Sequence, residues 1–381
     1  MIPSLHDIDV EGKRVLVRVD YNIPFKDGAV ADDKRIVATL PTLKHLLGHD
    51  ASQIVIMSHC GRPKGVVVPE LSLKPIATHL GELLGEQVAF VKDCIDVAIP
   101  KGKKIILLEN LRFHEEEEKD DAVFAKKLAK HGDVYVNDAF ATLHRAHASV
   151  SAVAKLFPER AAGLLVEREL KNLDFHNPER PYIALIGAAK ISDKIEIMEA
   201  LLEKVNKLLL GGAVIFPFFE AHGFEVGTSL CEDESVPLAK NLLEKHGDKI
   251  VLPTDVVISE NLESSEMFTV DTDKIPKNMK GLDIGDHSVE EFKRVLNTAK
   301  TVFWNGPLGV FEMPPFDTAT KEIAEFLAQK KIRVIVGGGD TASAVKKLGF
   351  SDYYTYVSTG GGAALEYIAG KELPGLKALE S

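Results

Sequence analysis

Short runs of Val, Ile and Leu alternate along this chain with longer stretches of amphipathic helical pattern. The apolar runs lie at residues 14–19, 53–57, 104–108 and 134–136, and then at 182–186, 207–210, 249–252, 301–304, 333–336 and 354–357. Runs this short, without strict alternation of polar and apolar residues, are typical of parallel strands buried on both faces. Strands that alternate with helices in this way predict an α/β fold.

The two sets of strands predict two domains, which suits a chain of 381 residues. A helical pattern begins near Leu164, between the two sets, and must end before Pro178. We therefore expect two Rossmann-like domains, each a parallel sheet flanked by helices, joined by an interdomain helix and hinge. The predicted limits are 1–163, an interdomain helix at 164–178, and 179–363, with a segment 364–381 that is a candidate to return to the first domain.

Composition and charge exclude several classes of protein. The longest apolar run, residues 208–219, is interrupted by Gly211, Gly212 and Pro217, whereas a membrane span needs about 20 residues. The formal net charge of −11 gives no overall attraction for nucleic acid or anionic lipid, so neither is an expected partner. The three cysteines are widely spaced, which favours a reducing cytoplasm. We interpret the acidic run 115–118 as the solvated start of a helix.

Arginine and histidine follow the strands of the first half. Arg62, Arg112 and Arg145 each lie a few residues beyond a strand, and Arg35 precedes a helix. Open α/β sheets bind ligands beyond the carboxyl ends of their strands, and guanidinium groups bind phosphate and carboxylate through two hydrogen bonds. Singly, each arginine is as well explained by a surface ion pair, but their shared position predicts a site for a small, highly anionic ligand. The neighbouring histidines, His59, His144 and His147, suit a structural or a functional role equally.

Glycine, lysine and aspartate follow the strands of the second half. The segment GGGDT, residues 337–341, lies between a strand and a helical pattern, where backbone N–H groups can approach an anion. Asp340 is a candidate ligand for Mg²⁺, and STGGG, residues 358–362, offers further backbone donors. Lys190 and Lys194 are spaced to share one helix face, although a solvated pair has the same spacing. The two halves together favour phosphoryl transfer between a small anion and a magnesium nucleotide.

A loose match to the dinucleotide-binding pattern, through Gly337, Gly339 and Ala342, leaves an NAD-dependent oxidoreductase as an alternative. It is a weak one, because the next strand ends in glycines and lacks the acidic residue that would bind the ribose.

Nine sequence blocks, in order along nearly the whole chain, resemble phosphoglycerate kinase. They are RVLVRVDYNIP, SHCGRPKG, ENLRFHEEEE, VNDAFATLHRAHAS, IGAAKISDKI, GLDIGD, WNGPLGVFE, VGGGDTASAV and STGGGAALE. The resemblance implies a monomer of two α/β domains that transfers a phosphoryl group between 1,3-bisphosphoglycerate and ADP, giving 3-phosphoglycerate and ATP, with Mg²⁺.

The resemblance also implies which residues bind each substrate. Phosphoglycerate would be bound in the first domain by Asp20, Tyr21, Asn22, Arg35, His59, Cys60, Gly61, Arg62, Arg112 and Arg145. The nucleotide would be bound in the second domain by Lys194, Gly281, Asn305, Glu312, Gly338, Gly339, Asp340 and Thr341, with Asp340 on the metal.

Both acceptor oxygens of this reaction are already ionised near neutral pH, so the chemistry needs no general base. We assign stabilisation of the moving phosphoryl group to Arg35, Lys190, Gly361 and Gly362. Because the two ligands would lie on different domains, we expect a hinge near residues 164–170 to close the cleft and exclude water.

Four positions depart from the glycine of the family pattern: Ala141, Ala188, Ala213 and Ala319. An alanine held in a left-handed conformation costs about 1–2 kcal/mol, and its methyl group adds bulk near a ligand. These alanines leave a nucleotide-binding protein without turnover as a second alternative.

Overall fold

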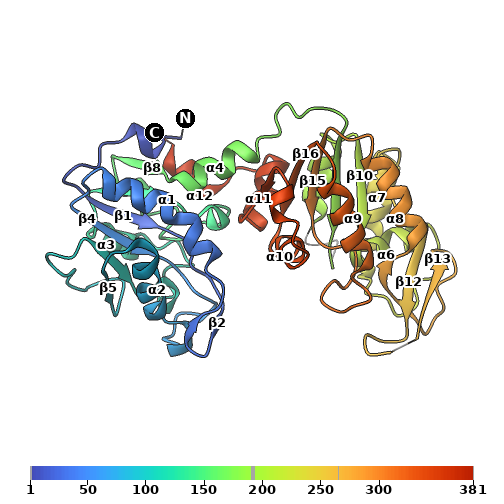
Figure 1. Ribbon diagram of the computed structural model, residues 1–381, viewed down its shortest axis with the longest axis horizontal. Coiled ribbons are helices and arrows are strands. Elements are labelled where there is room, and N and C mark those ends of the chain that lie inside the picture. Colours follow the sequence, from blue (N-terminus) through green and yellow to red (C-terminus); the bar gives the residue numbers. More distant parts are fainter. Residues whose placement is uncertain (1, 190–193, 265, 381) are drawn as a thin grey trace. The chain divides into compact units, whose positions relative to one another are not determined.

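The computed structural model describes residues 2–189, 194–264 and 266–380 and divides the chain into two units. Unit 1 is formed by Met1–Lys171 together with Lys371–Ser381, and unit 2 by Asn172–Gly370. Each unit is built on a parallel sheet with helices packed against it (Figure 1). This confirms the predicted α/β class with two Rossmann-like sheets.

The sheet of unit 1 has six strands, in the order β5-β6-β4-β1-β7-β8, and every pair is parallel. The strands are β1 (Arg14–Arg18), β4 (Gln53–Met57), β5 (Val88–Val91), β6 (Ile105–Leu108), β7 (Val134–Asn137) and β8 (Arg160–Ala162). A short hairpin is formed by β2 (Phe25–Lys26) and β3 (Ala29–Val30). The inner strands β6 and β7 are buried along their whole length, as their apolar sequences predict.

The helices of unit 1 are α1 (Lys34–Gly48), α2 (Lys74–Leu84), α3 (Ala122–Ala129), α4 (Leu164–Asn172) and α12 (Pro374–Leu379). In Figure 1, α1 and α2 lie side by side, and their apolar faces join the core beneath the sheet. Helix α12 belongs to unit 1 although it ends the chain: Gly375 N–H donates to Leu143 O at 2.9 Å, and Leu379 is completely buried. Short 3₁₀ turns, among them η3 (Leu111–Phe113), follow several strands.

The main sheet of unit 2 also has six parallel strands, in the order β11-β10-β9-β15-β16-β17. They are β9 (Tyr182–Gly187), β10 (Lys207–Gly211), β11 (Ile250–Val251), β15 (Thr301–Asn305), β16 (Arg333–Gly337) and β17 (Tyr356–Val357). A separate antiparallel sheet is formed by β12 (Asp255–Ser259), β13 (Met267–Asp271) and β14 (Lys280–Ile284).

The helices of unit 2 are α5 (Ile195–Leu202), α6 (Phe216–Ala221), α7 (Val236–His246), α8 (Asp286–Leu296), α9 (Thr318–Ala328), α10 (Gly339–Lys347) and α11 (Gly362–Ala369). Helices α8 and α9 lie side by side in Figure 1. Among the described residues, no helix combines the length and apolar character that crossing a membrane requires.

The acidic run 115–118 does not begin a helix, so that expectation was wrong. Residues 115–120 form turns, and α3 begins only at Ala122, where Asp121 accepts hydrogen bonds from Val123 N and Phe124 N. Glu117 is completely buried rather than solvated. Its hydrogen-bond partner Ser149 lies 32 positions away along the chain, which a local charge pattern does not reveal.

Candidate active site

The loops after β1, β4, β6 and β7 meet at one edge of the unit 1 sheet, because these strands are parallel neighbours. Hydrogen bonds join three of the loops: Asn22 Oδ1 accepts from Gly61 N at 2.9 Å, and Arg112 donates to Gly61 O at 2.8 Å. The structure thus brings together predicted site residues that the sequence spaces far apart.

Asp20 fixes the first of these loops. Its carboxylate pairs with the guanidinium of Arg35, at the start of α1, and accepts a hydrogen bond from Asn22 N at 3.1 Å. Asp20 is only 7% exposed, whereas the side chain of Arg35 remains 35% exposed. Arg35 is therefore oriented by Asp20 and still accessible to a ligand.

Arg112 lies in η3 and is 4% exposed. Its Nε lies 3.1 Å from a carboxylate oxygen of Glu118, but burial lowers the pKa of Arg112, with the charges of Arg18 and Arg145 adding to the shift. An arginine stays protonated in a protein, so this buried positive charge favours the approach of an anion.

The three histidines of this region are neutral at pH 7. Burial, and secondarily the neighbouring arginines, lower the pKa of His59, His144 and His147, to about 3 for His147. The positive charge of the site therefore comes from arginine, and the histidines offer neutral hydrogen-bonding groups.

The remaining predicted residues of unit 1 differ in exposure. Arg62 is exposed, and no described residue forms a hydrogen bond or ion pair with its side chain, while Arg145 is partly buried near Arg112 and His144. Tyr21 and Cys60 are buried: the Tyr21 hydroxyl lies 3.0 Å from Thr39 Oγ1, and burial raises the pKa of the Cys60 thiol. A pocket of about 610 Å³ beside Asn22, Cys60 and Gly61 is not lined by any of the arginines.

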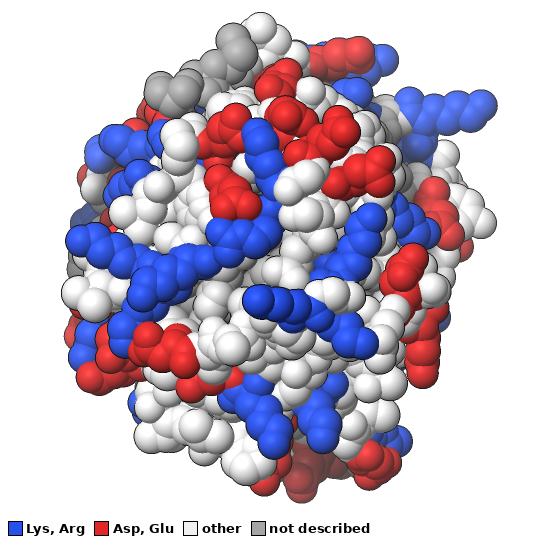
Figure 2. Space-filling view, turned by 90° about the vertical axis from the view of Figure 1, so that its left-hand side faces the viewer, with Lys and Arg blue, Asp and Glu red and all other residues white. Residues whose placement is uncertain are grey.

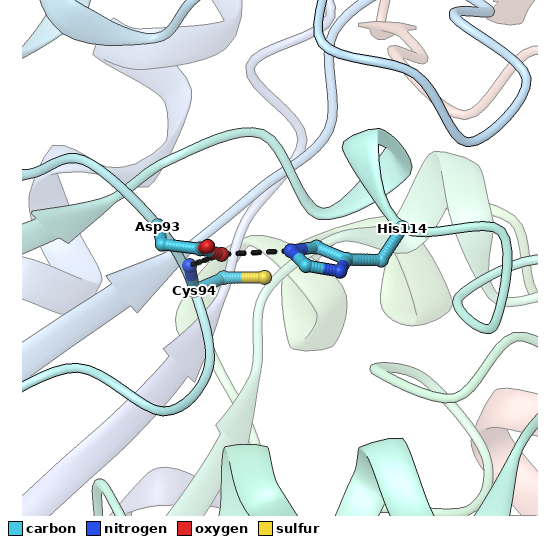
Figure 3. Close-up of side chains that lie close together, drawn as sticks. All are labelled: Asp93, Cys94 and His114. Carbon is cyan, nitrogen blue, oxygen red and sulfur yellow. Dashed lines mark hydrogen bonds and ion pairs between the residues drawn. The ribbon is translucent and has the colours of Figure 1, made fainter.

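Asp93, Cys94 and His114 lie close together beyond β5 and β6 (Figure 3). The arrangement is held by hydrogen bonds: Asp93 Oδ1 lies 2.7 Å from His114 Nε2 and accepts from Cys94 N at 2.6 Å. Burial and the adjacent Asp93 raise the pKa of the Cys94 thiol, which disfavours the thiolate that a metal requires. We interpret this cluster as a structural support for η3 and its Arg112.

The candidate site of unit 2 lies where β15 and β16 end. Gly338 has φ of +86° and precedes α10, whose N-terminal residues are Gly339 and Asp340. Thr341 is completely buried, and its Oγ1 accepts from Gly306 N at 2.5 Å, which ties the loop after β15 to α10. This loop and the helix N-terminus present backbone donors suited to a phosphate.

Asn305 is the most informative residue of this region. It ends β15, is 3% exposed, and its Nδ2 has no hydrogen-bond partner among the residues that the structure describes. An unpartnered buried donor is costly, so its presence indicates that a ligand oxygen completes the site. Asp340 is exposed in the first turn of α10, so its carboxylate oxygens are accessible to a magnesium ion.

The other predicted residues of unit 2 lie on separate elements. Gly281, in β14, donates from its backbone N–H to Ser229 Oγ at 2.9 Å. A Cβ atom at this position would lie 2.5 Å from the ring of Phe216, so the site has no room for a side chain. Glu312 is exposed in a turn, and Gly361, with φ of +53°, precedes Gly362 at the start of α11. Lys194 directly precedes α5 rather than lying within it. Lys190 lies outside the described residues.

None of the four alanines that replace glycine has a positive φ: Ala141, Ala188, Ala213 and Ala319 are absent from the left-handed residues of the chain. Ala319 is buried at the start of α9, where its N–H donates to Asp283 at 3.0 Å. The strain that favoured a protein without turnover is therefore not present at these positions.

The electrostatic character of the site is local. On the face shown in Figure 2, basic and acidic side chains are interspersed and neither sign dominates. Because the chain carries a net charge of −11, an anionic ligand must be bound by the arginines gathered at the sheet edge.

Sequence reasoning missed Arg18, which lies at the end of β1 and is 1% exposed, and Glu117 beneath it. The signal for Arg18 was present, since a charged residue within a buried apolar run requires a partner.

Comparison with known proteins agrees with this geometry. Residues 5–371 match the family model for phosphoglycerate kinase. The phosphoglycerate kinase of Chlorobium phaeobacteroides (strain BS1) is 49% identical over 99% of this chain and 98% of that protein, and that of Prosthecochloris aestuarii is 47% identical with the same coverage. The structure of phosphoglycerate kinase from Coxiella burnetii superposes with a TM-score of 0.89 at 37% identity, covering 100% of this chain and 99% of that one. The chain therefore belongs to the phosphoglycerate kinase family and is a phosphotransferase.

Proposed function

We propose that this enzyme transfers a phosphoryl group between 1,3-bisphosphoglycerate and ADP, giving 3-phosphoglycerate and ATP in glycolysis. The observation that carries the proposal is the division of two chemically different sites between the units. Unit 1 gathers arginines and neutral histidines at one sheet edge, and unit 2 combines a glycine-rich helix N-terminus with the Asn305 amide, to which no described residue bonds.

Phosphoglycerate carries phosphate and carboxylate groups that suit the unit 1 site. Arg35, Arg62, Arg112 and Arg145 supply the charge, and Asp20 orients Arg35. The hydrogen bond from Gly61 N to Asn22 Oδ1 holds the loops after β1 and β4 in place relative to one another. Tyr21 and Cys60 contribute through their backbone, because their side chains are buried.

The nucleotide suits the unit 2 site. We assign its phosphates to the N-terminus of α10 and to Asn305 Nδ2, with Lys194, Gly281, Glu312, Gly338, Gly339 and Thr341 as further binding residues. Asp340 would hold Mg²⁺, which neutralises phosphate charge when it is bound.

In the reaction toward ATP, a β-phosphate oxygen of ADP forms the new bond to phosphorus while the acyl phosphate P–O bond breaks, leaving the carboxylate of 3-phosphoglycerate. No proton moves, so the residues act by alignment and charge stabilisation. We assign Arg35 and Lys190 to the oxygens of the transferred group, assisted by the backbone of Gly361 and Gly362.

We also propose that the enzyme works as a monomer in the cytoplasm, with magnesium as its metal. The functional domains proposed are residues 1–163 and 179–363, with 164–178 between them and 364–381 after them.

The direct test is the purified enzyme with Mg-ATP and 3-phosphoglycerate, coupled through glyceraldehyde-3-phosphate dehydrogenase to oxidation of NADH. We expect turnover, and we expect Lys190→Ala to lower kcat at least about 100-fold, because a cation on the transferred group is lost. Lys207→Ala is the matched control: this lysine begins β10, at the other end of the strand from the glycine-rich loop, and donates to Asp248 O.

The proposal is supported if the wild type and Lys207→Ala turn over the substrates and Lys190→Ala is strongly impaired. Nucleotide binding without turnover would leave the family assignment intact and contradict the activity. Preferential binding of NADH would instead favour the oxidoreductase alternative.

A further inference from the structure

A buried network of two opposite charges lies beneath the arginine site of unit 1, and the proposed mechanism does not use it. Arg18 is 1% exposed and Glu117 completely buried. Arg18 Nε donates to Ser149 Oγ at 2.8 Å, and this hydroxyl donates to Glu117 at 2.6 Å. The Glu117 carboxylate also accepts from Ser149 N at 2.9 Å. The attraction between the two opposite charges and their hydrogen bonds offset the free energy of removing them from water.

The network ends on His59. Arg18 Nη2 lies 3.2 Å from His59 Nδ1, and both side chains are buried. A guanidinium has only donors, so Nδ1 must accept. The His59 ring is neutral, because burial and the nearby arginines hold its pKa well below the ordinary value. A neutral ring with Nδ1 as acceptor carries its proton on Nε2.

Asp20 would favour the opposite tautomer. Its Oδ1 lies 3.8 Å from the same Nδ1, and a carboxylate can only accept. That distance exceeds a hydrogen bond, and Asp20 is already engaged by Arg35 and by Asn22 N. Arg18 is therefore the nearer partner, and it decides which ring nitrogen is protonated.

We propose that Arg18 is a positioning residue that fixes the Nε2–H tautomer of His59, so that this histidine donates a hydrogen bond to the anionic substrate. No described residue bonds to His59 Nε2, which leaves this N–H available to a ligand. The opposite tautomer would present a lone pair to the oxygens of the anion. The identity of that anion rests on the proposed function, whereas the tautomer itself does not.

The test is the ¹⁵N NMR spectrum of the histidine rings in the full-length protein, with the His59 signals assigned from their loss in His59→Gln. In the wild type we expect the shift of an unprotonated nitrogen at Nδ1 and of a protonated one at Nε2. In Arg18→Met the donor is gone, so we expect the proton to move to Nδ1, toward Asp20. Arg18→Lys keeps a donor and should retain the wild-type tautomer. An unchanged tautomer in Arg18→Met would overturn the proposal.

Arg18→Met leaves the Glu117 carboxylate buried without its countercharge, which can prevent folding. The double variant Arg18→Met/Glu117→Gln removes both charges and should show the same movement of the proton. In whichever of these variants folds, we expect the dissociation constant for 3-phosphoglycerate to rise about tenfold, while that for Mg-ADP is unchanged.

A wild type that does not bind 3-phosphoglycerate would contradict the proposed function, and the NMR result would still decide the role of Arg18. A moved proton with unaltered 3-phosphoglycerate affinity would overturn the donor role of His59.

Discussion

Single residues carry the chemistry of this enzyme through the conformations and protonation states that the fold imposes on them. The arginines at the unit 1 edge keep their charge under burial, whereas the histidines beside them lose theirs. In unit 2 the decisive residue has no charge: Gly338 adopts a φ of +86° against the side chain of Asn305. A residue with a Cβ at this position would press on the amide group that we assign to the nucleotide.

Gly338→Ala is expected to weaken nucleotide binding at least tenfold, since its Cβ would lie 2.7 Å from Asn305 Nδ2. Gly349→Ala is the matched control, because Gly349 has φ of +78° and nothing within 4 Å of the added methyl group. Both substitutions should cost about 1–2 kcal/mol of stability from the left-handed conformation. Calorimetric titration with Mg-ADP distinguishes them, and equal affinities in the two variants would contradict the role of Asn305.

At the level of elements, the sequence predicts the strands of the two parallel sheets except β5 and β8, and it misses the antiparallel sheet β12–β14. Every predicted strand is present, with its ends within two residues of the predicted limits. A continuous apolar run must be buried on both faces, and a strand inside a parallel sheet meets that requirement. The missed β5 is an edge strand, and the missed β13 is mostly exposed, so burial leaves little trace in their sequences. The loops that hold Arg62, Arg112 and Arg145 were predicted at the sheet edge because each arginine lies a few residues beyond the carboxyl end of a strand. The Arg18–Ser149–Glu117 contacts were not, since they depend on tertiary packing.

Helix α4 begins on a buried carboxylate. Asp138 Oδ1 accepts hydrogen bonds from Leu165 N at 2.9 Å and Val166 N at 3.3 Å, and burial raises the pKa of Asp138 to about 6. A carboxyl that binds its proton more tightly when folded stabilises the native state at low pH and loses that stabilisation as the pH rises from about 4 to 6.

Asp138→Asn keeps an oxygen acceptor for α4 but does not titrate. Relative to this variant, the wild type should lose about 2 kcal/mol of stability between about pH 4 and pH 7, out of a full pH-dependent term of about 3 kcal/mol at 1.36 kcal/mol per pKa unit. Urea unfolding at the two pH values measures the difference. Parallel pH profiles for the two proteins would show that Asp138 is already ionised below pH 4 in the folded state.

At the scale of the whole molecule, the proposed ligands bind to different units, so transfer requires the two to come together. We expect the radius of gyration from small-angle X-ray scattering to fall when 3-phosphoglycerate and Mg-nucleotide are both present. Either ligand alone should produce a smaller change, because only when both are bound can the residues assigned to one unit also act on the ligand of the other. An unchanged radius with both ligands bound would contradict domain closure.

The C-terminal helix α12 sets the order in which the units become complete during synthesis. Unit 2 is one continuous stretch, Asn172–Gly370, whereas unit 1 needs Lys371–Ser381 as well as Met1–Lys171. The ribosome therefore starts unit 1 first but finishes unit 2 first. Until residues 371–381 emerge, Leu143 O lacks its hydrogen bond from Gly375, and the surface that buries Leu376 and Leu379 stays open. Unit 1, to which we assign the phosphoglycerate site, is thus completed only after unit 2 has been synthesised.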